Sequence, residues 1–308
     1  MRILVVGAGA TGGYFGGRLA EAGQDVTFLV RPRRAAELAS LGLQVRSRYG
    51  DISILQPKTV LGEEICEPFD LVLLSCKAYD LENAMASVAP AVGPETVILP
   101  LLNGMRHLEM LDERIGAARV LGGQCFIAAM MNDKHEVVHL NENHEISFGE
   151  RDGSKSDRSQ AIAAAFAGAR CNSRLSESIL QEMWEKWVFI ATGAGITCLM
   201  RASVGEIEAA GGAGLAIAML DECATIAAGE GFPPRAASLQ KSRATLTASG
   251  SPLTASMLRD VERQGPTEAE HVLGDLLRRG REGASPLLRT ALIHLRAHEI
   301  RRAARNKS

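Results

Sequence analysis

The sequence predicts an α/β N-terminal domain followed by an all-helical C-terminal domain. Up to about residue 150, apolar β-branched runs alternate with helical stretches, which favours a parallel sheet with crossover helices. From about residue 175 onward, almost every segment has helical periodicity. The polar segment 151–159, RDGSKSDRS, marks a surface loop before this change of character. We therefore expect one domain over residues 1–170 and a second over residues 171–308.

The composition is that of a soluble globular protein of two domains, with 308 residues, 46% of them hydrophobic. The 34 Lys and Arg residues nearly balance the 36 Asp and Glu residues, so no nucleic-acid or anionic-membrane partner is expected. The longest uncharged apolar run, residues 187–200, is too short to span a bilayer. No signal peptide is recognised, and the six cysteines form no CxxC pair, so we expect reduced thiols and a cytoplasmic location.

A glycine-rich turn, Gly7-Ala8-Gly9-Ala10-Thr11-Gly12, lies between the predicted strand 3–6 and a helix that extends to about residue 22. With the second strand at 26–30, this is the context that the dinucleotide-binding fingerprint requires. Gly7 would make the tight turn, Gly9 would let the backbone approach a pyrophosphate, and Gly12 would let helix and strand pack closely. The motif therefore predicts a Rossmann-type dinucleotide-binding domain rather than an ordinary turn.

The residue at the end of the second strand indicates which dinucleotide is bound. NAD sites usually carry Asp or Glu there, to accept a hydrogen bond from the ribose 2′-hydroxyl. This chain has Arg31, followed by Arg33 and Arg34, and the next carboxylate is Glu37. Because a guanidinium pairs well with a 2′-phosphate, the pattern indicates NADP(H). The alternative is a solvated basic loop.

The remaining elements of the first domain follow in alternation. Strands are expected at 43–47, 52–56, 71–76 and 97–102, helices at 33–40, 81–89, 105–114 and 160–167, and antiparallel strands at 119–131 and 135–148. Two polar residues follow strands of the expected sheet, Lys77 and Asn103, where ligands of open α/β sheets bind. Lys77 would reach the cofactor, and Asn103 the nicotinamide ribose or a substrate oxygen. Alternatively, each is a loop residue that bonds its own backbone.

The second domain is expected to consist of helices at 177–200, 203–209, 212–230, 235–247, 254–263, 267–281 and 286–304. On the first of these, Trp184, Trp187, Val188 and Ala191 form an apolar face. Lys186 points away from it, onto a face of mostly small residues that continues through Ile190, Gly193, Ala194 and Thr197. Reduction of a ketone requires a proton donor, and a partly desolvated lysine can supply one. The alternative is an ordinary solvated lysine.

Glu268 is a second candidate for chemistry, because it borders the apolar stripe of the 267–281 helix while Glu270 points to solvent. Its alternative role is a first-turn carboxylate that suits the helix dipole. His294 and His298 share one helix face, but no third ligand accompanies them, and no metal site is expected.

Taken in order, several motifs resemble those of the ketopantoate reductases (2-dehydropantoate 2-reductases), over essentially the whole chain. They are Gly7-Ala8-Gly9-Ala10-Thr11-Gly12, Cys76-Lys77-Ala78-Tyr79-Asp80, Asn103-Gly104, Trp184-Glu185-Lys186-Trp187 and Ser256 followed by Thr267-Glu268. The resemblance implies NADPH-dependent reduction of 2-dehydropantoate to (R)-pantoate, in the pantothenate branch of coenzyme A biosynthesis. It also implies a Rossmann domain and a helical domain with the active site between them, and helical domains of such enzymes often pair, so a homodimer is expected.

The resemblance assigns a role to each candidate residue. Lys186 would be the general acid, and Glu268 the carboxylate near the nicotinamide ribose and the reacting centre. Lys77 and Asn103 would contact the cofactor, and Asn103 and Ser256 the substrate.

The substrate-facing positions depart from the family pattern. Pantoate-forming members tend to carry asparagines one and two turns after the lysine, where this chain has Ile190 and Ala194. Loss of these amide donors would weaken recognition of a polar hydroxy-keto acid. A reductase of a more apolar 2-keto compound is therefore the second hypothesis. A non-catalytic NADPH-binding regulator is the third, although binding alone would not need Lys186 and Glu268.

Overall fold

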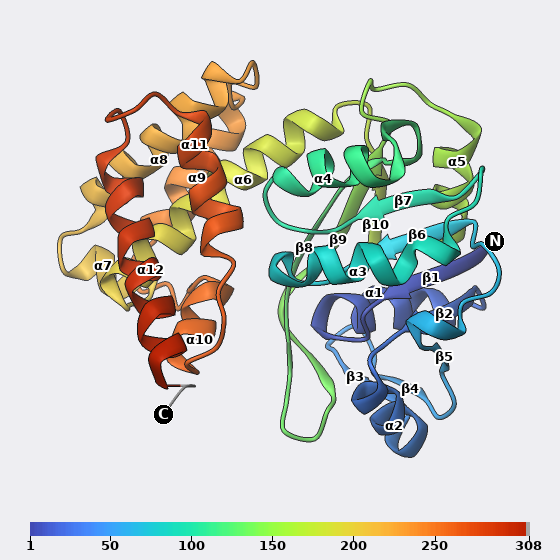
Figure 1. Ribbon diagram of the computed structural model, residues 1–308. Helices are drawn as coiled ribbons and strands as arrows, with labels where there is room; N and C mark the ends of the chain where they lie inside the picture. Colours follow the sequence, from blue (N-terminus) through green and yellow to red (C-terminus); the bar gives the residue numbers. More distant parts are fainter. Residues whose placement is uncertain (306–308) are drawn as a thin grey trace. The chain divides into compact units, whose positions relative to one another are not determined.

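The chain divides into two compact units in the computed structural model, which describes residues 1–305 (Figure 1). The first unit comprises Met1–Leu102 and His107–Leu180. The second comprises Asn103–Arg106 and the chain from Gln181 onward. The division at Leu180 falls later than the boundary expected at residue 170, because the strand at Asn172–Leu175 pairs within the first unit.

A five-stranded parallel sheet of order β5-β2-β1-β6-β7 forms the centre of the first unit. The strands are β1 (Arg2–Val6), β2 (Asp25–Leu29), β5 (Lys58–Val60), β6 (Leu71–Leu74) and β7 (Val97–Pro100). Ile3 of β1 aligns with Val26 on one side and with Leu71 on the other. β6 and β7 are buried along their whole length, as apolar strands covered on both faces should be. The predicted α/β class is confirmed.

A second sheet of order β10-β9-β3-β4, with β8 paired to β9, completes this unit. Its strands are β3 (Leu43–Arg46), β4 (Ile52–Ile54), β8 (Gly122–Met131), β9 (Val137–Gly149) and β10 (Asn172–Leu175). The antiparallel pairing of β8 with β9 is confirmed. The segments expected at 43–47 and 52–56 pair antiparallel to each other in this second sheet, and not in the parallel one.

Helices connect these strands, and most follow the sequence-based expectations closely. They are α1 (Ala10–Glu21), α2 (Pro32–Leu41), α3 (Leu81–Val88), α4 (Arg106–Ile115) and α5 (Asp157–Ala167), with short 3₁₀ turns η1 (Gly62–Glu64), η2 (Ala78–Asp80), η3 (Ala89–Ala91) and η4 (Ala117–Arg119).

Helix α1 is packed between the two sheets, and its paired glycines make this possible. A Cβ atom on Gly16 would lie 2.6 Å from the Phe28 ring of the parallel sheet. On Gly13 it would lie 2.9 Å from Val137 of the second sheet. Both distances are too short for a real Cβ, so glycine alone permits the close approach of both sheets to this helix.

The second unit is helical, as expected. Its elements are α6 (Ile179–Met200), α7 (Val204–Ala209), α8 (Ala213–Gly229), α9 (Ala236–Leu246), α10 (Ser256–Glu262), the π-helix η5 (Glu270–Gly274), α11 (Asp275–Arg279) and α12 (Pro286–Arg305). The single helix expected over 267–281 is instead a π-helical turn followed by a short α-helix. Throughout residues 1–305, no helix combines the length and apolar character needed to cross a membrane.

Candidate active site

The glycine-rich loop has the geometry that its spacing predicts. Gly7 has φ of +91°, which favours glycine, and its N–H donates to the Leu29 carbonyl at 2.9 Å. Gly9 is the N-cap of α1, and its carbonyl accepts from Gly13 N–H at 2.8 Å. A Cβ on Gly12 would overlap the Gly7 carbonyl oxygen and the Ser75 hydroxyl, so this position requires glycine. The loop therefore brings the start of α1 onto the ends of β1 and β6.

The same loop leaves space for an anion at the N-terminus of α1. Within the described chain, no heavy atom beyond the immediate neighbours lies within 4 Å of a Cβ placed on Gly9, and no side chain caps this helix. The first turn of α1 also carries no acidic residue. Its first N–H groups lack intrahelical partners and carry partial positive charge, which suits a pyrophosphate. The residues present thus fit a dinucleotide.

Arg31 and Lys77 lie at the carboxyl edge of the same parallel sheet, after β2 and β6. Arg31 is 73% exposed, and its Nη2 donates to Asp80 Oδ1 at 2.7 Å. Asp80 ends the turn η2, whose N-cap is Lys77, so this ion pair holds the two segments together. An exposed ion pair of this kind contributes little to the free energy of unfolding. Arg31 can therefore exchange Asp80 for a phosphate at a small cost in free energy.

The coenzyme preference gives a direct test of Arg31. We expect Arg31→Ala to raise the Kd for NADPH by about 10- to 100-fold, the effect of losing a charge-assisted phosphate contact. The Kd for NADH should change little. Arg33→Ala is the control, because Arg33 is exposed and pairs with Glu37 at 3.1 Å. Equal loss of affinity for both coenzymes in Arg31→Ala would contradict a 2′-phosphate contact. Fluorescence titration measures both constants.

In the second unit, Lys186 lies on α6 and is only 7% exposed. The apolar face of Trp184, Trp187, Val188 and Ala191 is buried as predicted. Glu185 fixes the rotation of this helix, because its carboxylate accepts bonds from the Arg235 backbone N–H at 2.9 Å and from two guanidinium nitrogens at 2.7 Å. Burial pushes the pKa of Glu185 upward, but these bonds outweigh it and hold that pKa below its usual value.

The small-residue face of α6 continues beyond Lys186 and receives the start of α10. Thr197 donates to the Gly193 carbonyl at 2.6 Å and accepts from the Ala255 N–H at 3.3 Å. This bond joins Ala255, the N-cap of α10, to that face, and Ser256 follows as the first residue of α10. Ile190 is half-buried, while Ala194 is only 4% exposed.

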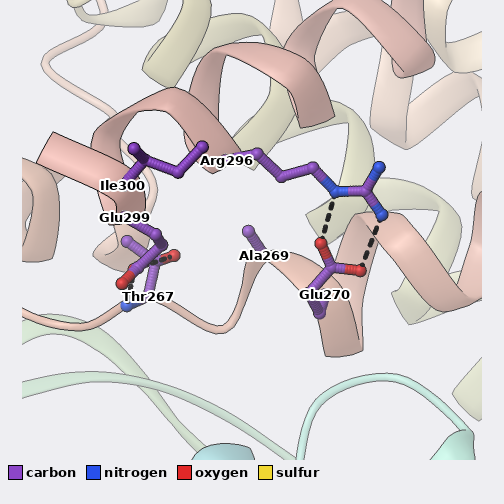
Figure 2. Close-up of a pocket in the computed structure, with 6 residues that line it drawn as sticks. All are labelled: Thr267, Ala269, Glu270, Arg296, Glu299 and Ile300. Carbon is purple, nitrogen blue, oxygen red and sulfur yellow. Dashed lines mark hydrogen bonds and ion pairs between the residues drawn. The ribbon is translucent and has the colours of Figure 1, made fainter. Parts of the chain in front are cut away.

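Glu268 is only 8% exposed and is held by contacts on either side of it. Before it, the Thr267 N–H and hydroxyl both donate to Glu299 of α12, at 2.7 and 2.8 Å. After it, Glu270 pairs with Arg296 through two bonds, the longer of them 3.0 Å. Figure 2 shows both contacts lining one pocket, which is bounded by Thr267, Ala269, Glu270, Arg296, Glu299 and Ile300.

Asn103 is grouped with the second unit, although it closely follows β7 of the parallel sheet. The next residue, Gly104, has φ of +81° and packs on His271 of η5. Asn103, Lys186, Ser256 and Glu268 thus belong to one unit, and the glycine-rich loop, Arg31 and Lys77 to the other. His271 was not singled out from the sequence; its place in the run Thr267-Glu268-Ala269-Glu270-His271 was the available signal.

Both units match one protein family. Residues 3–153 match the family described as Ketopantoate reductase PanE/ApbA, and residues 178–299 match Ketopantoate reductase PanE/ApbA C terminal. An uncharacterized oxidoreductase of Bacillus subtilis (strain 168), YkpB, is 39% identical over 302 residues, which cover 97% of this chain and 99% of that protein. A 2-dehydropantoate 2-reductase of Archaeoglobus fulgidus is 29% identical over 292 residues, 91% of each protein.

Solved structures agree with this assignment. The crystal structure of 2-dehydropantoate 2-reductase from Geobacter metallireducens GS-15 superposes with a TM-score of 0.87 at 30% identity, covering 96% of this chain and 99% of that one. Members of the family are oxidoreductases that act on a keto or hydroxyl group and use NADPH. The glycine-rich loop of this chain fits that cofactor. The chain belongs to the ketopantoate reductase family and is an NADPH-dependent oxidoreductase.

Proposed function

We propose that this enzyme reduces 2-dehydropantoate to (R)-pantoate with NADPH, in the pantothenate branch of coenzyme A biosynthesis. The observation that carries the proposal is a buried lysine, Lys186, on the small-residue face of α6. Ser256 directly follows Ala255, whose backbone N–H donates to Thr197 on the same face. A buried lysine on this face and a hydroxyl at the neighbouring start of α10 support a site for a small 2-keto acid.

The proposed chemistry divides between the cofactor and the side chains. When bound, NADPH supplies the hydride to the keto carbon. Lys186 donates a proton from Nζ to the keto oxygen as negative charge develops there, a role worth about 10²- to 10⁴-fold in rate. Asn103 and Ser256 donate hydrogen bonds that orient the substrate. Glu268, fixed through its neighbours Thr267 and Glu270, orients the nicotinamide ribose and the reacting centre.

A second candidate is reduction of a more apolar 2-keto compound, and Ile190 and Ala194 favour it. Neither side chain can donate a hydrogen bond, and a substrate hydroxyl facing them would lose its partner. A site without such donors discriminates less against alkyl groups of similar size. The enzyme class and the role of Lys186 are the same in both candidates.

Steady-state kinetics with a panel of 2-keto acids tests the two candidates against each other. The panel contains 2-dehydropantoate, 2-ketoisovalerate and bulkier branched 2-keto acids, followed as NADPH oxidation. A kcat/KM for 2-dehydropantoate above about 10⁴ M⁻¹s⁻¹, and above all competitors, is expected for the natural substrate. A higher kcat/KM for an apolar 2-keto acid would identify that compound as the better candidate for the natural substrate. In that case Ile190→Asn with Ala194→Asn should shift preference toward 2-dehydropantoate.

The homodimer and the cytoplasmic location stay predictions. Sedimentation equilibrium of the purified chain tests the first, with a mass near twice 32.9 kDa expected. Localisation of a tagged chain tests the second.

A further inference from the structure

His271 lies close to three segments that carry candidate site residues: the segment of Glu268, helix α6 with Lys186, and the Asn103–Gly104 turn. It belongs to the π-helix η5, whose geometry is frequent at functional sites. The backbone N–H groups of His271 and Val272 both donate to the Glu268 carbonyl, at 3.1 and 2.9 Å. The Val272 carbonyl in turn accepts from Trp187 Nε1 at 2.8 Å, next to Lys186 on α6. The backbone around His271 is therefore fixed relative to both Glu268 and α6.

The His271 side chain contacts the turn that carries Asn103. A Cβ on Gly104 would lie 3.1 Å from the His271 carbonyl oxygen and 3.2 Å from ring atom Cδ2. A backbone hydrogen bond also joins the ring to Asn103. His271 as a whole is 8% exposed, so these contacts are made largely out of water. Such contacts restrict where the Asn103 side chain can lie.

Burial and the charged groups around the ring have opposing effects on the pKa of His271. Burial is the largest influence and lowers the pKa of His271 from its ordinary value of 6.5. Arg106 acts in the same direction, while the carboxylates of Glu268 and Asp275 and the bond with Asn103 raise this pKa. Because the lowering effects win, the ring is neutral at neutral pH. A protonated ring would be repelled by Arg106 and attracted to the Glu268 carboxylate. Protonation would therefore change the position of the ring relative to the Asn103–Gly104 turn and to Glu268.

We propose that His271 is a positioning residue for the reduction: its buried ring holds the Asn103–Gly104 turn in place beside Glu268, so that Asn103 and Glu268 keep their orientations. The inference rests on the proposed function, since it assigns Asn103 and Glu268 to the reacting centre. It adds a pH dependence. The kcat should fall on the acid side of pH 6.5 as His271 takes up a proton, because its contacts with the Asn103–Gly104 turn and with Glu268 change together.

Two substitutions and one control test this role. His271→Phe keeps a ring but removes the polar contact, and His271→Gln keeps a donor but does not titrate. His298→Gln is the control, because His298 is also buried and its Nε2 lies 3.2 Å from a backbone carbonyl, that of Gly265. The first readout is hydrogen–deuterium exchange of the peptide containing residues 103–106, without substrate. The second is the pH dependence of kcat.

We expect His271→Phe to raise exchange in the 103–106 peptide and to lower kcat, each by about tenfold, the effect of one lost buried hydrogen bond. His271→Gln should stay within a few-fold of wild type in both, and its kcat profile should lose the acid limb. Unchanged exchange in folded His271→Phe would overturn the proposal. If that variant does not fold, His271→Gln decides: loss of the acid limb supports the role, and a wild-type profile refutes it.

The two proposals can fail independently. If the wild-type enzyme reduces no 2-keto acid, the proposed function is refuted. Hydrogen–deuterium exchange of the 103–106 peptide still reports whether His271 holds the Asn103–Gly104 turn. His298→Gln should behave as wild type in both readouts. If it reproduces the effects of His271→Phe, these effects reflect general loosening of the helical unit and the positioning role is refuted.

Discussion

Lys186→Ala should lower kcat by about 10²- to 10⁴-fold, because it removes the proton donor to the developing alkoxide. The glycine-rich loop, Arg31 and Lys77 belong to the other unit, so NADPH should bind with nearly unchanged Kd. Stopped-flow oxidation of NADPH measures the first effect, and fluorescence titration the second. Turnover would then be lost while the cofactor site stays intact.

Lys241→Ala is the matched control for this variant. Lys241 lies on α9 in the same unit and is exposed, so its loss should leave kcat unchanged. Wild-type turnover in Lys186→Ala would mean that another group or water supplies the proton. A protein that binds NADPH but has no wild-type turnover with any 2-keto acid would instead support the non-catalytic regulator.

Gly9→Ala and Gly12→Ala should affect different properties, NADPH affinity in the first variant and stability in the second. The backbone of Gly9, with φ of −87°, is accessible to alanine, and its Cβ would enter open space, so this variant should fold normally. It should nevertheless raise the Kd for NADPH by about 100-fold, because the methyl group takes the place of the pyrophosphate. Gly12→Ala would clash with Gly7 and Ser75 and should lower Tm by about 5 °C or more.

Gly214→Ala is the control for both glycine variants. No atom within the described chain, apart from those of its immediate neighbours and its own helix backbone, lies within 4 Å of a Cβ on Gly214, and this glycine is in α8 of the other unit. It should change neither Tm nor NADPH affinity to a measurable extent, beyond the small gain of alanine in a helix. Tight NADPH binding by Gly9→Ala would show that the pyrophosphate does not approach this position.

The parts of the fold with strong local signals were predictable. The strand, glycine-rich turn and helix of the first thirty or so residues follow from spacing alone, and the long helices of the second unit from their helical periodicity. The second sheet was predicted only in part. Its strands β3, β4, β8 and β9 were expected, but β10 (Asn172–Leu175) is short and polar and is held by pairing with β9 rather than by its own pattern. The π-helix η5 was not predicted either. Its Val272 carbonyl accepts a hydrogen bond from Trp187, which lies 85 positions away in the chain.

The candidate site shows the same limit. Residue type and position made Arg31, Lys186 and Glu268 candidates, but could not predict the ion pair between Arg31 and Asp80, whose partners are 49 positions apart. His271 was missed for a similar reason. Its contact with Asn103 joins segments far apart in the chain, and no local periodicity reports such a contact.

Transfer of a labelled hydride tests whether this chain reduces a 2-keto acid with NADPH. The enzyme is incubated with 2-dehydropantoate and NADPH that carries deuterium at the transferable position of its nicotinamide ring, and the product is examined by mass spectrometry and NMR. We expect (R)-pantoate with one deuterium on the former keto carbon, and none from Lys186→Ala within the same time. Failure to transfer deuterium to 2-dehydropantoate or to any 2-keto acid of the panel would contradict it.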